Sequence, residues 1–345
     1  GNYNVAIGDE AGTAITTGDE NTFVGYAVGD AVTTASANTG VGYNALTANT
    51  SGTQNTAVGN RAGDAITEGD GNTAIGYFSL STTTTADNNT AVGVDSLGLN
   101  STGADNTGIG KDALRANTTA SNNTAVGSNA MVANTTGEYN VAVGATAGDA
   151  LTTGSVNTAV GYNTLGVATT AANNTALGGQ ALAVTTSGAN NTAVGMNAMV
   201  ANTTGAQNTA LGALALDVNT TGLGNTAVGV DALGANTTAS YNSAFGRHAL
   251  LLNTTGDGLT AVGHQALQAN TTGDDNIAMG GYGASSGIYA ALYANTTGKQ
   301  NVALGVGALR TNTTADNNTA VGYKSLHANT TGEKNTAVGF GALDA

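Results

Sequence analysis

The chain has 345 residues and a formal net charge of −14, and it contains 52 glycines but no proline, tryptophan or cysteine. The absence of cysteine excludes disulfide scaffolds and cysteine metal sites. Eight basic residues against 22 acidic ones disfavour nucleic acid as a partner, and without an apolar run of about 18 residues this chain is not expected to insert into a membrane.

A five-residue motif, Asn-Thr-Ala-Val-Gly or a close variant, recurs along the whole chain. It begins at Asn4 and returns every 17 residues to Asn335 with one irregular step, giving twenty copies. A strict short period means that each unit contacts only its neighbours, so the array grows in one direction without a globular core. We therefore expect residues 1–345 to form one continuous array. The predicted fold is all-β, a parallel β-solenoid (β-roll) of about twenty 17-residue coils.

Within the repeat, numbered 1 to 17 from the leading Asn, positions 2 to 5 predict a strand and its end. Position 2 is usually Thr, position 3 is Ala or Gly in all but one copy, position 4 is large and apolar, and position 5 is always Gly. This alternation is typical of a short strand. The second half of the repeat, as in residues 266–273, predicts a second short strand in each coil.

Large apolar side chains mark the predicted core. Position 9 is Leu or Met in sixteen copies and Gly in the other four, and in those four a large apolar residue stands at position 12 instead. This exchange indicates that the side chains of positions 9 and 12 reach the same interior space. In a close-packed core that space has room for only one large side chain. With the apolar residue of position 4 added, the expected core-filling residues include Val58, Leu46, Ile66 and Leu267.

Identical polar and small residues recur at the same positions and predict ladders along the axis. Asn55 and Asn72 at position 1 are expected to pair amide to amide between coils, and Gly59 and Gly76 at position 5 belong to the same structural ladder. Because one coil buries only about two large side chains, worth roughly 1.5 to 3 kcal/mol each, the core is thin. The flat Ala/Gly row of positions 3 and 5 is therefore expected to pack against another chain in a side-by-side homotrimer.

The one irregular step is an eight-residue insertion that places a loop at residues 281–290. Tyr282, Ser285, Ser286 and Tyr289 are the candidate recognition residues in this loop, because tyrosine offers flat amphipathic contact area. A tolerated insertion without function is the alternative.

The repeat Asn-Thr-Ala-Val-Gly-x-x-Ala-Leu resembles the head repeats of trimeric autotransporter adhesins of the YadA type, and also the repetitive shafts of phage tail fibres. The resemblance covers nearly the whole chain. It implies a left-handed parallel β-roll, assembly of three chains side by side, and a lateral surface that binds host-cell, matrix or glycan surfaces. The 17-residue unit is longer than that of the family, and the chain shows no coiled-coil stalk, anchor or chaperone domain.

Catalysis is not expected. The three histidines have no acidic or cysteine partner at metal-ligand spacing, and a regular array offers no cleft for a catalytic triad. We therefore expect no enzyme activity, no catalytic or metal site and no cofactor. The predicted function is a structural and adhesive shaft of an extracellular, cell-surface or virion fibre. One alternative is a self-polymerising filament subunit that stacks end to end through uncapped coils, and a second is an ice-binding solenoid that orders water on ranks of Thr.

Overall fold

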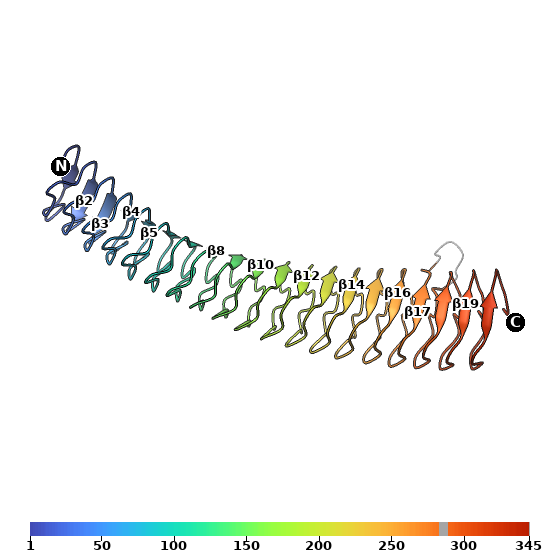
Figure 1. Ribbon diagram of the computed structural model, residues 1–345. Coiled ribbons are helices and arrows are strands. Elements are labelled where there is room, and N and C mark those ends of the chain that lie inside the picture. Colours follow the sequence, from blue (N-terminus) through green and yellow to red (C-terminus); the bar gives the residue numbers. More distant parts are fainter. Residues whose placement is uncertain (283–288, 345) are drawn as a thin grey trace. The chain divides into compact units, whose positions relative to one another are not determined.

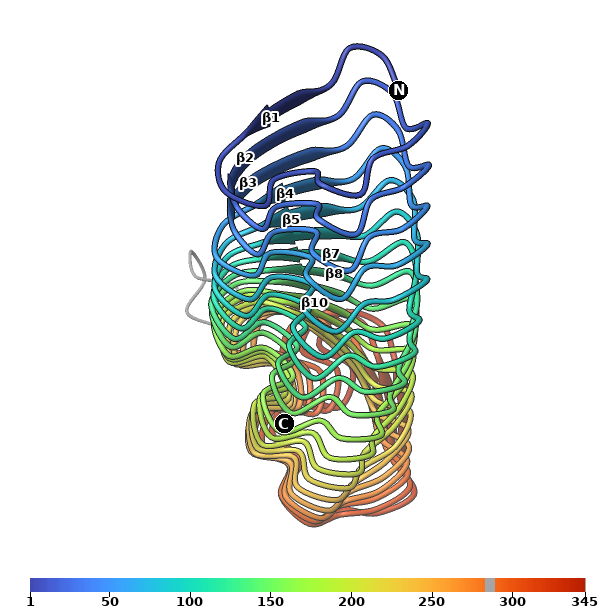
Figure 2. The same cartoon turned by 90° about the vertical axis from the view of Figure 1, so that its left-hand side faces the viewer.

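The computed structural model describes residues 1–282 and 289–344. The chain splits into two compact units, Gly1–Asn173 and Asn174–Ala345, and each is a parallel β-solenoid with one strand per 17-residue coil. Figures 1 and 2 show the strands of each unit lying one beside the next, with a turn-rich limb closing every coil.

The first unit contains ten strands in its described residues. They are β1 (Val5–Ile7), β2 (Thr22–Tyr26), β3 (Thr39–Tyr43), β4 (Thr56–Val58), β5 (Thr73–Ile75), β6 (Thr90–Val92), β7 (Thr107–Ile109), β8 (Thr124–Val126), β9 (Val141–Val143) and β10 (Thr158–Val160).

The second unit also contains ten strands in its described residues. They are β11 (Thr175–Leu177), β12 (Thr192–Val194), β13 (Thr209–Leu211), β14 (Thr226–Val228), β15 (Ser243–Phe245), β16 (Thr260–Val262), β17 (Ile277–Met279), β18 (Val302–Leu304), β19 (Thr319–Val321) and β20 (Thr336–Val338).

Equivalent residues of successive repeats lie opposite one another within each unit. Ala57 of β4 pairs with Ala74 of β5, and Ala193 of β12 pairs with Ala210 of β13, in both cases 17 residues apart and parallel. The predicted solenoid and its 17-residue coil are confirmed.

The strands turn position 3 inward and positions 2 and 4 outward. Ala57 at position 3 is fully buried, whereas Val58 at position 4 is 36% exposed. The prediction that Val58 fills the core is therefore wrong. The small position 3 side chain leaves the interior free for position 9, where Leu46 and Leu267 are fully buried as predicted. The same finding corrects the expected packing surface, because the position 3 row lies inside its own coil and is not available to another chain.

In the described residues the second limb of the coils is not a strand, contrary to the prediction. Its position 7 and position 9 residues have positive φ, as at Asn44 (53°) and Leu46 (54°), so the backbone cannot stay extended. It still bonds to the next coil, because the Leu46 amide donates to the Ala62 carbonyl at 3.1 Å. The limb is a stack of turns held by bonds between coils.

The exchange between positions 9 and 12 is a packing exchange, as predicted. Ile66 at position 12 is buried, and a Cβ on Gly63 at position 9 of the same coil would lie 3.0 Å from its Cδ1. At Gly29 the space is taken by the buried Phe23, whose ring would lie 2.6 Å from a Cβ placed there. Ile66 takes the interior space of its coil, whereas in the coil of Gly29 the buried Phe23, Val28 and Val32 share it.

Asparagine ladders hold the coils together. Asn72 is buried, its backbone N–H donates to Oδ1 of Asn55 at 2.8 Å, and its own Oδ1 accepts the backbone N–H of Asn89 at 2.9 Å. This pair therefore bonds from backbone to side chain and not amide to amide as predicted, because Nδ2 of Asn72 donates to the Ala86 carbonyl. At position 5, a Cβ on Gly59 would lie 2.5 Å from the carbonyl oxygen of Gly76, and φ of Gly59 is 141°. Glycine is required there because the next coil approaches too closely for any side chain.

Candidate functional site

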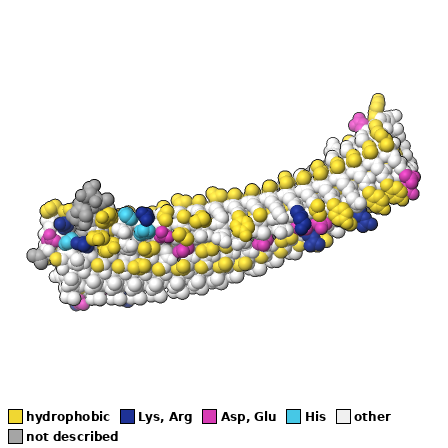
Figure 3. All heavy atoms as spheres, turned by 180° about the vertical axis from the view of Figure 1, so that it is seen from behind, with side chains coloured by type: hydrophobic (Ala, Val, Ile, Leu, Met, Phe, Trp, Pro, Cys, Tyr) yellow, Lys and Arg dark blue, Asp and Glu magenta, His cyan; other side chains and the backbone are white. Residues whose placement is uncertain are grey.

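The outward face of the strands carries a row of apolar side chains in each unit. No position 4 residue is buried, and Ile75, Ile109, Leu211 and Phe245 are each between 39% and 48% exposed. Figure 3 shows yellow side chains in regular rows on the surface. Since scattered exposed apolar residues are ordinary but contiguous rows are not, this apolar row is a candidate interaction surface.

Threonines of position 2 lie on the same face, two residues before each apolar side chain. Thr56, Thr73 and Thr90 are half-buried and align with one another in the strand register. The outward face therefore consists of a Thr row beside an apolar row, without charge.

The region of the insertion brings aromatic rings together. The rings of Tyr282 and Tyr289 lie 5.6 Å apart between centroids, Tyr289 lies 4.5 Å from Tyr293, and Tyr282 meets His264 edge to face at 5.9 Å. Tyr282 and Tyr289 are half-buried, so they are less exposed than predicted for a loop that leaves the array. The other two predicted recognition residues, Ser285 and Ser286, lie outside the described residues.

Basic side chains from neighbouring coils join these rings. The guanidinium carbon of Arg310 lies 4.6 Å from the centroid of the Tyr289 ring, and its Nη1 lies 3.3 Å from Nε2 of His327. In Figure 3, histidine and basic side chains gather beside the grey residues. Arg310 and His264 are not among the predicted recognition residues, although their positions 10 and 6 in the coils beside the insertion are a signal that would have found them.

Burial lowers the pKa of both imidazoles in this region. For His264, burial acts first and the charges of Arg247 and His248 lower the pKa further. For His327, burial lowers the pKa more than the carboxylate of Asp344 raises it, and the charge of Arg310 also lowers it. Both rings are therefore predominantly neutral at pH 7 and can each donate and accept one hydrogen bond.

His248 contacts a carboxylate that the spacing argument did not predict. Its Nε2 lies 3.4 Å from Oδ2 of Asp231, which occupies the same position one coil earlier. Across the described residues no group of three or more His, Cys, Asp or Glu side chains is placed to hold a metal ion.

Acidic residues at position 16 act as acceptors between coils. Oδ1 of Asp70 accepts the amide N–H of Thr53 at 2.6 Å and its hydroxyl at 2.9 Å, and Oδ1 of Asp257 accepts the amide N–H of Ser240 at 2.6 Å. These carboxylates stabilise the stack, so their recurrence has a structural explanation.

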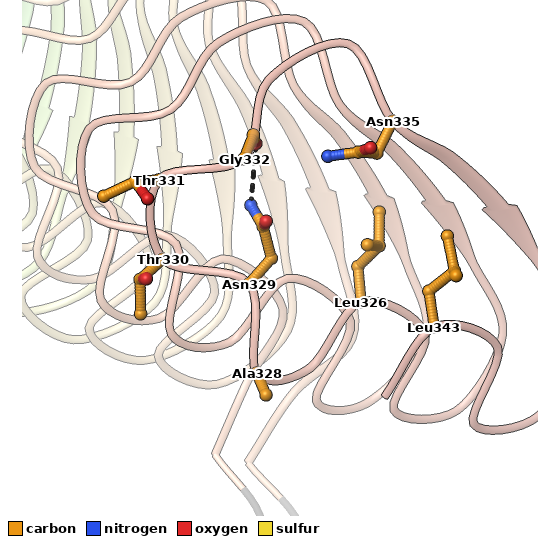
Figure 4. A pocket seen from close by; sticks show the side chains of 8 residues that line it. All are labelled: Leu326, Ala328, Asn329, Thr330, Thr331, Gly332, Asn335 and Leu343. Atoms are coloured by element: carbon orange, nitrogen blue, oxygen red, sulfur yellow. Dashed lines mark hydrogen bonds between the residues drawn. The ribbon is translucent and has the colours of Figure 1, made fainter. Parts of the chain in front are cut away.

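A hollow of about 330 Å³ lies on the last coil. Figure 4 shows Leu326, Asn335 and Leu343 around it, with Nδ2 of Asn329 donating to the Gly332 carbonyl at 3.0 Å. Leucines of position 9 and asparagines of positions 1 and 12 line it, and in earlier coils these side chains face the next repeat. The hollow is therefore the surface on which a coil stacks, and it has no separate ligand chemistry.

No protein-family model matches the chain, and no curated protein matches its sequence. The described residues contain no helix long and apolar enough to cross a membrane.

Proposed function

We propose that this protein is a structural and adhesive shaft of an extracellular, cell-surface or virion fibre, and that it is not a catalyst. The observation that carries the proposal is the apolar row at position 4, which repeats in every coil on an outward sheet face. The stacked coils are held by asparagine and glycine ladders and need no cofactor for that role.

In this proposal the apolar row contacts a second and a third copy of the same chain. A copy offers the same 17-residue coil period, so each apolar side chain of one chain meets an equivalent side chain of the next at every coil. Side chains such as Val58 and Ile75 would then lose the water contact that they retain in a single chain. The homotrimer expected from the resemblance thus uses position 4 as its contact surface.

Sedimentation equilibrium of the full chain tests this association. The test variant replaces four neighbouring apolar residues by threonine, which is β-branched like valine and isoleucine and keeps strand preference. These four residues are Val58, Ile75, Val92 and Ile109. The control variant replaces four exposed position 14 threonines of the turn limb by serine. These four are Thr85, Thr102, Thr119 and Thr136.

The wild type and the control are expected to sediment as trimers of the 33.3 kDa chain at micromolar concentration, and the test variant is expected to dissociate. A monomeric wild type, or a test variant that associates as tightly as the control, would reject the apolar row as the contact surface.

Ice binding is a second candidate, favoured by one observation. The Thr row of position 2 and the apolar row of position 4 share one uncharged outward face in register, and such a face can order water over several coils. Thermal hysteresis of the purified chain tests this function. Replacing Thr73, Thr90 and Thr107 by leucine should abolish the hysteresis, and its absence from the wild type would reject ice binding.

A further inference from the structure

The second unit contains one cluster that combines aromatic faces, neutral imidazole and unpaired cations. We call it the aromatic–basic patch. Its members come from four successive coils and are Arg247, His264, Tyr282, Tyr289, Tyr293 and Arg310.

The ring-to-ring contacts form a continuous path across the patch. His264 contacts Tyr282, Tyr282 contacts Tyr289, and Tyr289 contacts Tyr293 over centroid distances between 4.5 and 5.9 Å. Such contacts limit the rotamers of the rings, so a ligand that stacks on them pays a smaller ordering cost. All four residues are only partly buried. The patch therefore presents a preorganised aromatic surface to solvent.

The cations of the patch lack carboxylate partners. Among the described residues, no carboxylate oxygen lies within 4 Å of the charged nitrogens of Arg247 or Arg310, whereas Lys299 lies 2.7 Å from Asp274. Arg310 stacks on Tyr289, and among the described residues its guanidinium has one hydrogen-bond contact, to His327. Arg61 lies over the Phe78 ring at 5.4 Å in the first unit, so a guanidinium group beside a ring recurs in this chain, and the joined tyrosine rings are what distinguish the patch. The guanidinium groups of the patch are suited to an anionic group of a ligand.

The arrangement of cations and carboxylates around the patch favours one class of anionic ligand over another. Arg310 lies over Tyr289, one ring before the end of the aromatic path, and the charge of Arg247 acts on His264 at the other end. Carboxylates such as Asp231 and Asp344 lie beside the neighbouring His248 and His327. A phosphate backbone, with one charge per nucleotide, would meet these carboxylates without enough cations to offset them. A chain of sugars that carries only occasional carboxylates fits better, because pyranose rings have an apolar face that stacks on tyrosine and hydroxyls that bond to neutral imidazole.

We propose that the aromatic–basic patch binds an oligosaccharide that carries carboxylate groups, with the sugar rings on Tyr282, Tyr289 and Tyr293 and a carboxylate on the fork of Arg310. The inference rests on the adhesive part of the proposed function and gives its ligand class. It does not depend on association through the apolar row, which lies on the strands.

Isothermal titration calorimetry with the full chain tests the proposal. The carboxylated probes are 3′-sialyllactose and a hyaluronan tetrasaccharide, and the neutral probes are lactose and chitotetraose. At least one carboxylated probe should bind at least tenfold more tightly than its neutral counterpart. Arg310→Gln should remove this preference, and Tyr289→Leu should weaken binding of every probe that binds.

Two variants outside the patch serve as controls. Arg115→Gln removes a cation that already faces Asp112, and Tyr43→Leu removes an exposed ring that stacks on Tyr26 at 5.2 Å without a cation. Both should bind the probes as the wild type does. Circular dichroism and the sedimentation behaviour of each variant establish that the fold and the association are retained.

The proposal is overturned if neither carboxylated probe binds, if neutral and carboxylated probes bind equally, or if Arg310→Gln leaves the preference intact. Tighter binding of a single-stranded oligothymidylate than of both carboxylated probes would also overturn it, in favour of a nucleic-acid surface. A monomeric chain that binds the carboxylated probes would reject only the association of copies, so the two failures are distinguishable.

Discussion

Asn72→Ala should destabilise the first unit by about 2 to 6 kcal/mol. The substitution removes Oδ1, which accepts the amide N–H of Asn89 at 2.9 Å, and Nδ2, which donates to the Ala86 carbonyl at 2.8 Å. Within the described residues, neither the Asn89 amide nor the Ala86 carbonyl has another backbone or side-chain partner. Each buried polar group left unpaired costs about 1 to 3 kcal/mol. Two such groups give the stated range.

Chemical denaturation followed by circular dichroism, together with hydrogen exchange at the Asn89 amide, measures this loss. A stacked array can open in parts, so the exchange rate reports the local cost where a single unfolding midpoint does not. Asn60→Ala is the matched control, because Asn60 is exposed and its side chain makes no hydrogen bond in the described part of the chain. If Asn72→Ala lies within about 0.5 kcal/mol of this control, the asparagine ladder does not hold the coils together as argued.

Three further predictions follow from the packing and the charges. Gly59→Ala should lower the free energy of unfolding by at least about 1 to 3 kcal/mol, because the new Cβ would lie 2.5 Å from a backbone carbonyl oxygen at a residue whose φ is 141°. Gly179→Ala is the control in the same denaturation assay and should be nearly neutral, because a Cβ there has nothing within 4 Å. Gly63→Leu and Ile66→Asn should each lower the free energy of unfolding by about 1 kcal/mol or more. The double variant should recover most of this loss, because its leucine fills the space that isoleucine leaves. If the losses of the two single variants add up in the double variant, the two positions do not share one interior space. Burial raises the pKa of Asp64 above its unfolded value, so the folded state binds more protons and stability falls as pH rises through the raised pKa. Asp64→Asn should therefore raise the midpoint of unfolding at pH 7 and lose that advantage near pH 3, and an equal effect at both pH values would contradict this sign.

The repeat predicted the fold because its constraints are local and recur twenty times. Glycine at position 5 and the exchange at Gly63 and Ile66 each have one packing explanation, and the structure has that arrangement. Asparagine at position 1 links the coils as expected, but Asn55 accepts from the backbone N–H of Asn72 and not from its side chain. The direction of the strand could not be predicted. Alternation over three residues separates position 3 from positions 2 and 4, but it does not say which set faces in, and hydrophobicity favoured Val58 over Ala57.

The turn limb and the aromatic–basic patch could not be predicted from the sequence, for different reasons. Leu46 has positive φ, which is rare for leucine, so the pattern around it predicts a second strand that the structure does not contain. The insertion identified Tyr282 and Tyr289, but Arg310 contacts Tyr289 only because the coils stack. Contacts between positions that are distant in the repeat require the path of the coil, which a linear pattern does not contain.

The orientation of the strand, with Ala57 of position 3 facing inward and Val58 of position 4 facing outward, is evidence about function. If the array were selected only for its own stability, the larger apolar residue would gain most from the interior, since burying a valine side chain is worth about 1.5 to 3 kcal/mol. Here the interior is filled by position 9, and position 4 stays apolar in every repeat although water contacts it. A strand face that only needed to be soluble could carry threonine at position 4 as it does at position 2, with similar strand preference. The persistence of Val, Ile, Leu, Met and Phe at position 4 therefore favours a surface that covers it, and the proposed association with further copies would supply such a surface at every coil.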